Sequence, residues 1–269
     1  MGADIKALRI RIKSVDSTLH LTKAMGLVAS SKIRRANEAM KKGRDYREAL
    51  NGFVKELSYS PECRKSPYMQ MRGEDISRTR IIIIAGDRGL AGGYNANIMR
   101  LAATYKGAEF IPIGKRAHDK FTGELYSSER YTSADAKELA KKLCADFAAG
   151  EYDRLGIIST EYVSMMTQNA KITWLLPLER PEGEHLAGIV FEPDEMTVLD
   201  SVMPEYVAGV LMSEVRESFA SEVAARRMAM DSAGKNATAM IDELQLKYNR
   251  ARQGAITQEI TEIVAGAGQ

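Results

Sequence analysis

A glycine-rich turn is the stretch of this chain best suited to chemistry. Residues 86–95 come after the predicted strand 79–85, with its run of four isoleucines, and before a helical pattern, which is where α/β proteins place phosphate-binding loops. The turn lacks the Lys-Ser/Thr ending of a P-loop, and its glycine spacing is not the dinucleotide fingerprint. Two interpretations stay open: an α/β enzyme that binds a nucleotide here, or a tight structural turn of Asp87, Arg88 and Gly89, with Asp87 and Arg88 paired or docking a neighbouring segment.

The other reactive residue types are isolated in the sequence. Cys63 and Cys144 lie far apart with no second cysteine near either, so neither has the spacing of a zinc site or a redox pair. The three histidines are equally scattered, and no serine, cysteine or histidine constellation indicates a nucleophile. We therefore expect free thiols, no metal site, no cofactor and no catalytic centre in this chain.

The charge is distributed unevenly along the chain. The net charge is only +2, but residues 1–50 carry 12 Lys/Arg against 5 Asp/Glu. A basic end can meet nucleic acid or an acidic protein surface, so a basic coiled-coil protein that binds nucleic acid is a further alternative. Against it, no aromatic residues are interleaved to stack bases, and a solvated helix face explains the charge equally well.

Both ends of the chain have the pattern of long helices. Apolar residues near the N-terminus recur at steps of three and four, and the chain has no proline from 4 to 60. Residues 205–265 also lack proline and carry a second such stripe. This spacing is typical of a coiled coil, so we predict that the two ends pair as antiparallel helices. The two stripes are Ile5, Leu8, Ile12, Val15 and Leu19, and Ala237, Ile241, Leu244, Tyr248, Ala251 and Ala255.

The middle of the chain alternates between strand and helix patterns, which indicates an open α/β (Rossmann-like) sheet. The longest aliphatic run is too short to cross a bilayer, and the N-terminus is charged and helix-patterned rather than an apolar signal segment, so we expect a soluble chain that is not exported. We expect a strand at 170–178 to lie at a sheet edge, because Pro177 is tolerated there. The predicted strands are 79–85, 109–113, 124–131, 155–160 and 170–178, and the predicted helices are 95–105, 115–121 and 133–149, the last capped by Ser133.

The α/β domain is therefore predicted to be inserted between the two halves of a helical hairpin. The last helix should start near Asp194 and be kinked or reset at Pro204. The predicted organisation is an N-terminal coiled-coil helix at 1–60, a connector at 61–78, the inserted domain at 79–193 and a C-terminal coiled-coil helix at 194–269.

A resemblance to one known family goes beyond what periodicity supplies, and it is carried by segments 10–15, 21–29, 32–36, 87–90, 221–226, 236–237, 244–253 and 256–264. Together they are similar to the gamma subunit of the F-type ATP synthase, the central shaft of a rotary motor. Ala91 stands where many family members have a cysteine, and there is no cysteine pair of the light-regulated chloroplast type, so thiol switching is not expected.

The resemblance implies a rotor subunit without catalytic sites of its own. It would couple rotation of the c-subunit ring, driven by hydrogen ion transport, to ATP synthesis and hydrolysis at the beta subunits. Its expected partners are three alpha and three beta subunits, the epsilon subunit and the c ring, which would place the chain on the cytoplasmic face of the bacterial plasma membrane as a peripheral protein.

The resemblance also implies which residues meet these partners. The region around Tyr206 would bind the epsilon subunit and the c ring, and two groups of residues would meet the beta subunits. One is the tip segment of the last helix, with Arg252, Gln253, Thr257 and Glu259. The other is the face of the first helix, with Lys23, Met25, Arg34 and Arg35.

Overall fold

The computed structural model describes residues 2–70, 78–179 and 190–267. The described chain begins with helix α1 (Gly2–Tyr59) and ends with helix α5 (Glu195–Ala267). It divides into two compact units: Met1–Ser31 with Arg226–Gln269, here called the paired-helix unit, and Lys32–Ala225, here called the α/β unit.

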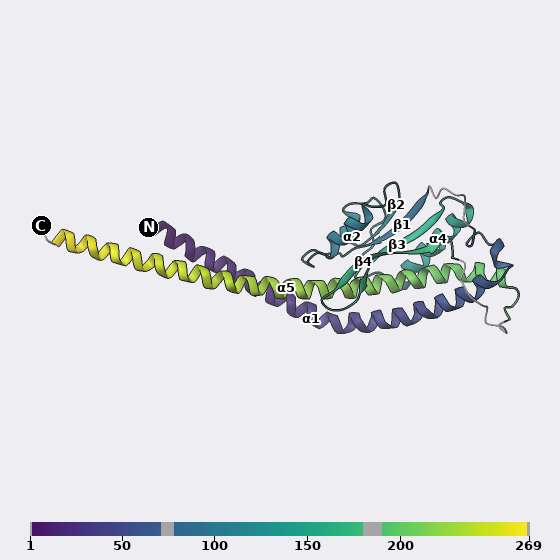
Figure 1. Cartoon of the computed structure of the whole chain (residues 1–269), viewed down its shortest axis with the longest axis horizontal. Helices are drawn as coiled ribbons and strands as arrows, with labels where there is room; N and C mark the ends of the chain where they lie inside the picture. The colour runs from purple at the N-terminus through teal and green to yellow at the C-terminus, as the bar shows by residue number, and fades with distance from the viewer. Residues whose placement is uncertain (1, 71–77, 180–189, 268–269) are drawn as a thin grey trace. The chain divides into compact units, whose positions relative to one another are not determined.

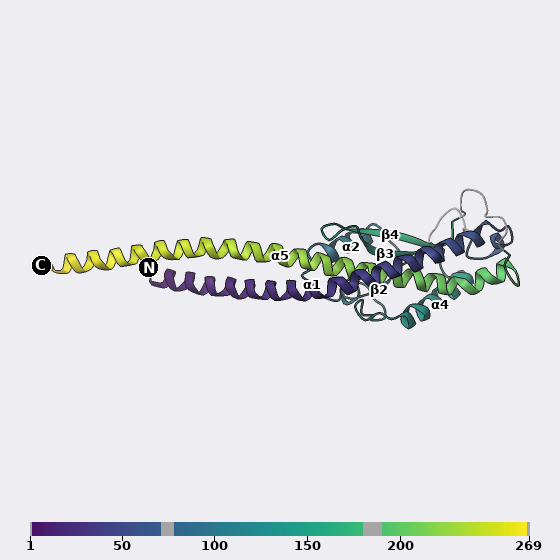
Figure 2. The ribbon, with the colours of Figure 1, turned by 90° about the horizontal axis from the view of Figure 1, so that it is seen from below.

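In the paired-helix unit, the start of α1 lies antiparallel to the end of α5 (Figures 1 and 2). Gly26 faces Met230, and Leu19 faces Gly234 four residues further along α5. The predicted apolar positions turn inward, because Leu19 and Leu244 are 8% and 7% exposed. The coiled-coil prediction is therefore confirmed, and its cause is the local spacing of these residues.

The α/β unit contains a mixed sheet of four strands in the order β2-β1-β3-β4. Strand β1 pairs in parallel with β2 and β3, whereas β4 is an edge strand antiparallel to β3. This confirms the predicted open α/β sheet and the predicted edge position of its last strand. The strands are β1 (Thr79–Ile84), β2 (Glu109–Ile113), β3 (Arg154–Tyr162) and β4 (Gln168–Leu176).

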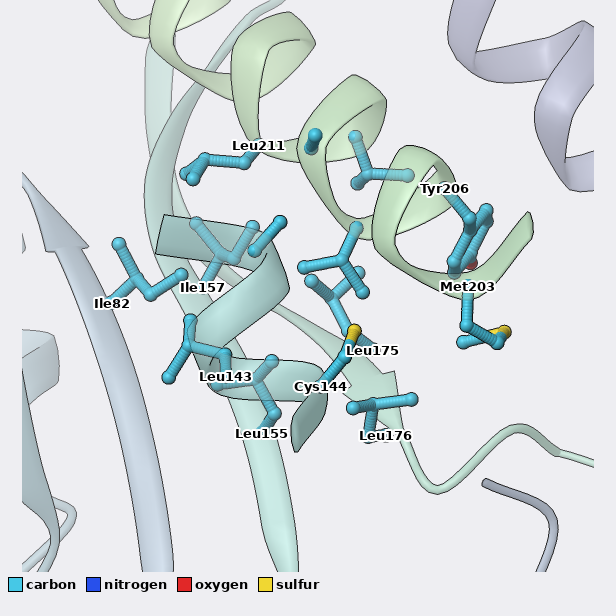
Figure 3. Close-up of a cluster of buried hydrophobic side chains, with 14 of the residues drawn as sticks. Ile82, Leu143, Cys144, Leu155, Ile157, Leu175, Leu176, Met203, Tyr206 and Leu211 are labelled. Carbon is cyan, nitrogen blue, oxygen red and sulfur yellow. The ribbon is translucent and has the colours of Figure 1, made fainter. Parts of the chain in front are cut away.

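Both faces of the sheet are covered, which explains the unbroken isoleucine run. Successive side chains of a strand point to opposite faces, so Ile81 and Ile83 pack on one face and Ile82 and Ile84 on the other. Helix α2 (Tyr94–Ala102) covers the first face, and helices α4 (Ser133–Ala149) and α5 cover the second. Figure 3 shows the second core between the strands and these helices.

Three sequence predictions for this unit are wrong in detail. The 124–131 stretch is not a strand: Tyr126 forms only an isolated bridge with Ile113, because the backbone that follows it bonds to a side chain, as described below. Helix α3 spans only Lys115–His118 rather than 115–121. Helix α4 is capped by Thr132, whose hydroxyl accepts from the Asp135 amide in a capping box, and not by Ser133.

The ends of the long helices agree better with the predictions. Helix α5 begins one residue after Asp194, whose carboxylate accepts from the Thr197 amide at 2.8 Å as an N-cap. It continues through Pro204, so the helix is not reset there. Before the sheet, a short 3-10 helix (Cys63–Lys65) follows α1.

Candidate functional site

The last turns of α5 have no helix beside them within the paired-helix unit (Figures 1 and 2). Arg252, Gln253, Thr257 and Glu259 are all exposed there, and the Arg252 side chain has no ion-pair partner among the described residues. Four large apolar side chains are also exposed: Ile256 at 47%, Ile260 at 55%, Ile263 at 70% and Val264 at 67%. This mixed surface has the character of a helix that meets another protein.

The polar side chains of this tip form hydrogen bonds largely within the helix itself. Thr257 donates to the Gln253 carbonyl at 2.9 Å, and Thr261 donates to the Thr257 carbonyl at 2.8 Å. Gln258 donates to Glu262 at 2.9 Å. With its hydroxyl hydrogen used in this way, Thr257 presents a methyl group and lone pairs to a partner, so Arg252 and Gln253 are left as the main free donors.

The predicted contact residues near the N-terminus belong to both units. Lys23 is exposed and Met25 is half-buried in the paired-helix unit, whereas Arg34 and Arg35 are exposed on α1 in the α/β unit. Lys23 and Met25 thus belong to one unit, and Arg34 and Arg35 belong to the other. Lys23 lines a groove of about 430 Å³ between α1 and α5, formed where Gly26 and Gly234 carry no side chain.

At Gly86, the start of the glycine-rich turn is occupied by side chains. The Gly86 amide donates to the Asn95 side chain at 2.9 Å, and a Cβ on Gly86 would lie 2.7 Å from Cδ of Glu222 on α5. Helix α5 therefore brings a carboxylate to the point where a nucleotide phosphate would approach. An anionic ligand is disfavoured there by both charge and space.

Asp87 organises the turn and the chain that follows β2. Its carboxylate accepts from the Ser127 hydroxyl at 2.5 Å, from the Lys115 and Ser128 amides at 3.1 Å, and from the Glu129 amide at 3.2 Å. Burial raises the pKa of Asp87, but these hydrogen bonds outweigh it and hold the pKa below its usual value. These bonds explain why 124–131 is not a strand.

The other two residues of the predicted turn have smaller roles. Arg88 does not pair with Asp87; its guanidinium lies 3.6 Å from the Glu129 carboxylate, which also pairs with Lys32 of α1. Gly89 has open space, since a Cβ there would meet only Arg116 at 3.8 Å. The backbone after it is tight: Leu90 has a φ of 61° and Gly92 a φ of 57°.

Tyr206 is buried rather than displayed. Its side chain is 8% exposed and packs with Met203 in the core that α5 shares with the sheet (Figure 3). Burial raises the pKa of Tyr206. Its neighbour Glu205 is exposed and pairs with Lys137 of α4 at 2.9 Å. A partner that binds this region would therefore meet Glu205 before Tyr206.

A buried polar cluster on α5 was not predicted from the sequence. Glu214 and Glu217 are at most 1% exposed, although carboxylates are seldom buried without partners. Both pair with arginines of α1, Arg47 and Arg44. The sequence pattern that could have predicted this cluster is a stripe of polar residues within an apolar stretch of the helix. Its members are Ser213, Glu214, Glu217, Ser218, Ser221 and Glu222.

No helix within the described residues is both long enough and apolar enough to cross a membrane.

Comparison with known proteins gives one consistent result. A family model described as ATP synthase matches residues 4–268. The ATP synthase gamma chain of Ruminococcus albus is 40% identical, over 97% of this chain and 96% of the relative. The sodium-ion-specific ATP synthase gamma chain of Acetobacterium woodii is 36% identical over 99% of each chain.

A solved structure of similar fold agrees with these relatives. It is a chain of the Euglena gracilis mitochondrial ATP synthase, determined as OSCP/F1/c-ring, with a TM-score of 0.72 and 16% identity; the match covers 98% of this chain and 94% of that one. That likeness concerns the fold alone. On the family model and the sequence relatives, this chain belongs to the ATP synthase gamma chain family and is a non-catalytic, central-stalk subunit of that enzyme.

Proposed function

We propose that the two units of this gamma chain divide the work of the rotor. The end of α5 turns inside the ring of three alpha and three beta subunits, and the α/β unit carries the surface that meets the epsilon subunit and the c ring. Rotation of the c ring is passed to the beta subunits, where ATP is made or hydrolysed. Through these partners the chain lies peripherally on the cytoplasmic face of a bacterial plasma membrane.

The observation that carries this proposal is the exposed end of α5. The stripe of Ile256, Ile260, Ile263 and Val264 is too apolar to remain in water without cost. The polar side chains beside this stripe form hydrogen bonds largely within the helix, so the tip can form few directional bonds to any one partner subunit. Such a surface suits a shaft that turns within an apolar sleeve.

Contacts that differ among the beta subunits come from the remaining polar groups. We assign Arg252 and Gln253, with Thr257 and Glu259, to a beta subunit, and Lys23, Met25, Arg34 and Arg35 to its acidic surface. A single off-axis shaft touches three chemically identical beta subunits differently, so each site acquires a different nucleotide affinity. Rotation then exchanges those affinities.

The two alternative functions are not favoured. A nucleotide at the glycine-rich turn would meet the carboxylate of Glu222, and the family assigns catalysis to another subunit. Nucleic-acid binding would rest only on the positive charge of the first helix. In the proposed assembly that charge is explained by contact with an acidic protein surface.

Site-specific crosslinking in the assembled enzyme tests the division of work. A photo-reactive residue at Gln253 should yield adducts with alpha or beta subunits, and one at Glu205 should yield adducts with epsilon or c subunits, identified by mass spectrometry. Adducts of Gln253 with c subunits, or of Glu205 with beta subunits, would contradict the proposal. Failure of the chain to co-purify with alpha, beta and epsilon subunits would contradict it more broadly.

A further inference from the structure

One face of α5 presents buried polar side chains to the end of strand β3. Glu214, Ser218 and Ser221 follow one another at steps of four and three residues, so they share one side of the helix. Each is at most 1% exposed. Polar groups buried so completely are stable only when they are bonded, and this face is therefore a polar joint within an otherwise apolar interface.

The joint binds backbone groups at the carboxyl end of β3. The Thr160 amide donates to the Ser218 hydroxyl at 3.1 Å, and the Ser221 hydroxyl donates to the Thr160 carbonyl at 3.2 Å. One turn away, the Tyr162 amide donates to Glu217 Oε1 at 3.0 Å. Each of these bonds crosses more than fifty residues of sequence, so each fixes α5 against the sheet.

The carboxylate of Glu217 also joins helix α1 to this contact. Arg44 donates from Nη2 to Glu217 Oε1 at 2.6 Å and to the Tyr162 carbonyl at 2.8 Å. The second carboxylate oxygen lies 3.5 Å from Nη1 of Arg47. From one buried position on α5, Glu217 thus contacts both α1 and β3.

A second carboxylate reinforces the joint one turn earlier on α5. Glu214 accepts from the Ser159 hydroxyl of β3 at 2.6 Å and pairs with Arg47 of α1. Lys171 of the edge strand β4 lies 3.9 Å from the same carboxylate. Glu214 and Glu217, on neighbouring turns of α5, therefore each contact strand β3 and an arginine of α1.

The mechanical properties of this joint differ from those of the apolar core beside it. Hydrophobic contact is non-directional, so an apolar helix face resists separation better than rotation about the helix axis. Charge-assisted hydrogen bonds are short and directional, and they break when α5 rotates on the sheet.

We propose that Glu217 is a positioning residue that locks α5 and α1 to the sheet, so that torque applied to the α/β unit enters both helices without slip. The proposal rests on the rotor function above and extends it by naming the place where the domain grips the shaft. It assigns a mechanical role to a residue that the expected partner-contact surfaces do not include.

Torsional stiffness of the assembled rotor tests the proposal directly. The complex of alpha, beta and gamma chains is fixed by its alpha–beta ring, and a bead is attached to the α/β unit at Lys106→Cys, an exposed position. The angular variance of the stalled bead reports stiffness. For Glu217→Gln we expect the variance to rise at least about twofold, because the charge-assisted bonds are weakened, with unloaded ATP hydrolysis unchanged.

Graded and control variants separate a joint from a merely stabilising residue. Arg44→Lys keeps the charge but not the guanidinium fork, so it should raise the variance less than Arg44→Ala does. Asp119→Asn removes an exposed carboxylate paired with Arg116 in the same unit and should leave the variance at the wild-type value. If a Glu217→Ala chain does not assemble into the complex, the Glu217→Gln chain still tests whether Glu217 stiffens the rotor.

Two outcomes would overturn the proposal while leaving the rotor function intact. One is a Glu217→Gln complex that assembles and rotates with wild-type variance, even if the free chain melts at a lower temperature. The other is an equal rise in Asp119→Asn. A chain that neither assembles nor rotates in its wild-type form would instead contradict the proposed function.

Discussion

Gly86 lies directly against the carboxylate of Glu222, although 136 residues separate them; a Cβ at this glycine would be 2.7 Å from Cδ and 2.8 Å from Oε1. Glu222 is 4% exposed, so its carboxylate has little room to move. The contact explains why a glycine is required at position 86, two residues after the isoleucine run ends, whether or not a phosphate binds nearby. The turn resembles a phosphate-binding loop, but its glycine is required by the close approach of α5 to the sheet.

Gly86→Ala is therefore expected to destabilise the chain. Placing a methyl group against the buried end of Glu222 should lower the free energy of unfolding by about 1–2 kcal/mol. Urea denaturation followed by circular dichroism measures the change. Gly52→Ala is the control: it lies in α1 with nothing within 4 Å of a new Cβ, and it should stabilise by up to about 1 kcal/mol. Equal effects of the two substitutions would refute this explanation.

The double variant Arg252→Ala, Gln253→Ala should weaken coupling without unfolding the chain. Both side chains are exposed, so the melting temperature should not change. A lost hydrogen bond to a charged group weakens a contact by about 1.5–3 kcal/mol, which should reduce torque and ATP synthesis in the assembled enzyme.

Rotation assays and ATP-synthesis rates measure that loss, and Arg64→Ala, another exposed arginine, serves as the control. Unchanged torque and synthesis in the double variant would remove these two residues from the contact but would leave the family unaffected.

The stability supplied by Glu217 should depend on pH in a defined direction. Burial raises its pKa, but the hydrogen bonds from Arg44 and the Tyr162 amide outweigh it, and the folded pKa lies below the ordinary value of 4.5. A depressed pKa stabilises the folded state above the unfolded pKa, and this stabilisation is lost as the pH falls through the folded pKa.

Urea denaturation of wild type and Glu217→Gln at a series of pH values checks this sign. The wild type should be the more stable at pH 7, and the difference should shrink only below about pH 4.5, near the ordinary glutamate pKa. A difference that stays constant from pH 7 to pH 3 would show that the charge of Glu217 does not matter.

Both native thiols should be inert in the folded chain. Cys63 and Cys144 are 0% and 1% exposed, and burial raises the pKa of Cys144 to about 12. At pH 8 only about one Cys144 in ten thousand is then a thiolate, which is the reactive form.

Labelling with a thiol reagent measures this protection. The native chain should remain unlabelled while Ser17→Cys, at an exposed position on α1, reacts quickly, and both native cysteines should react in urea. Labelling of either native thiol at the rate of the Ser17→Cys control would refute the predicted protection.

The sequence by itself determined the features that depend on neighbouring residues. The steps of three and four from Ile5 to Leu19 place these side chains on one face of a helix whatever surrounds it, so the coiled coil was predictable. The isoleucine run and Asp194 likewise indicate a buried strand and a helix start. The segments resembling the gamma family pointed to the same function as the comparisons.

Only the tertiary structure decided the features that depend on distant residues. No strand forms at 124–131, because the Asp87 carboxylate accepts from the Ser127 hydroxyl and from the Ser128 and Glu129 amides, 40 to 42 residues away. Tyr206 turns into the core rather than outward. Whether Tyr206 or its surroundings meet partners stays a prediction.

Glu217 shows the physical reason for this limit most clearly. Its bond to Arg44 spans 173 residues, and a carboxylate on a helix has the same local pattern whether it faces water or a buried arginine. Spacing along the chain sets which side chains share a face, but only packing sets what that face meets and what it costs to leave a charge unpaired there.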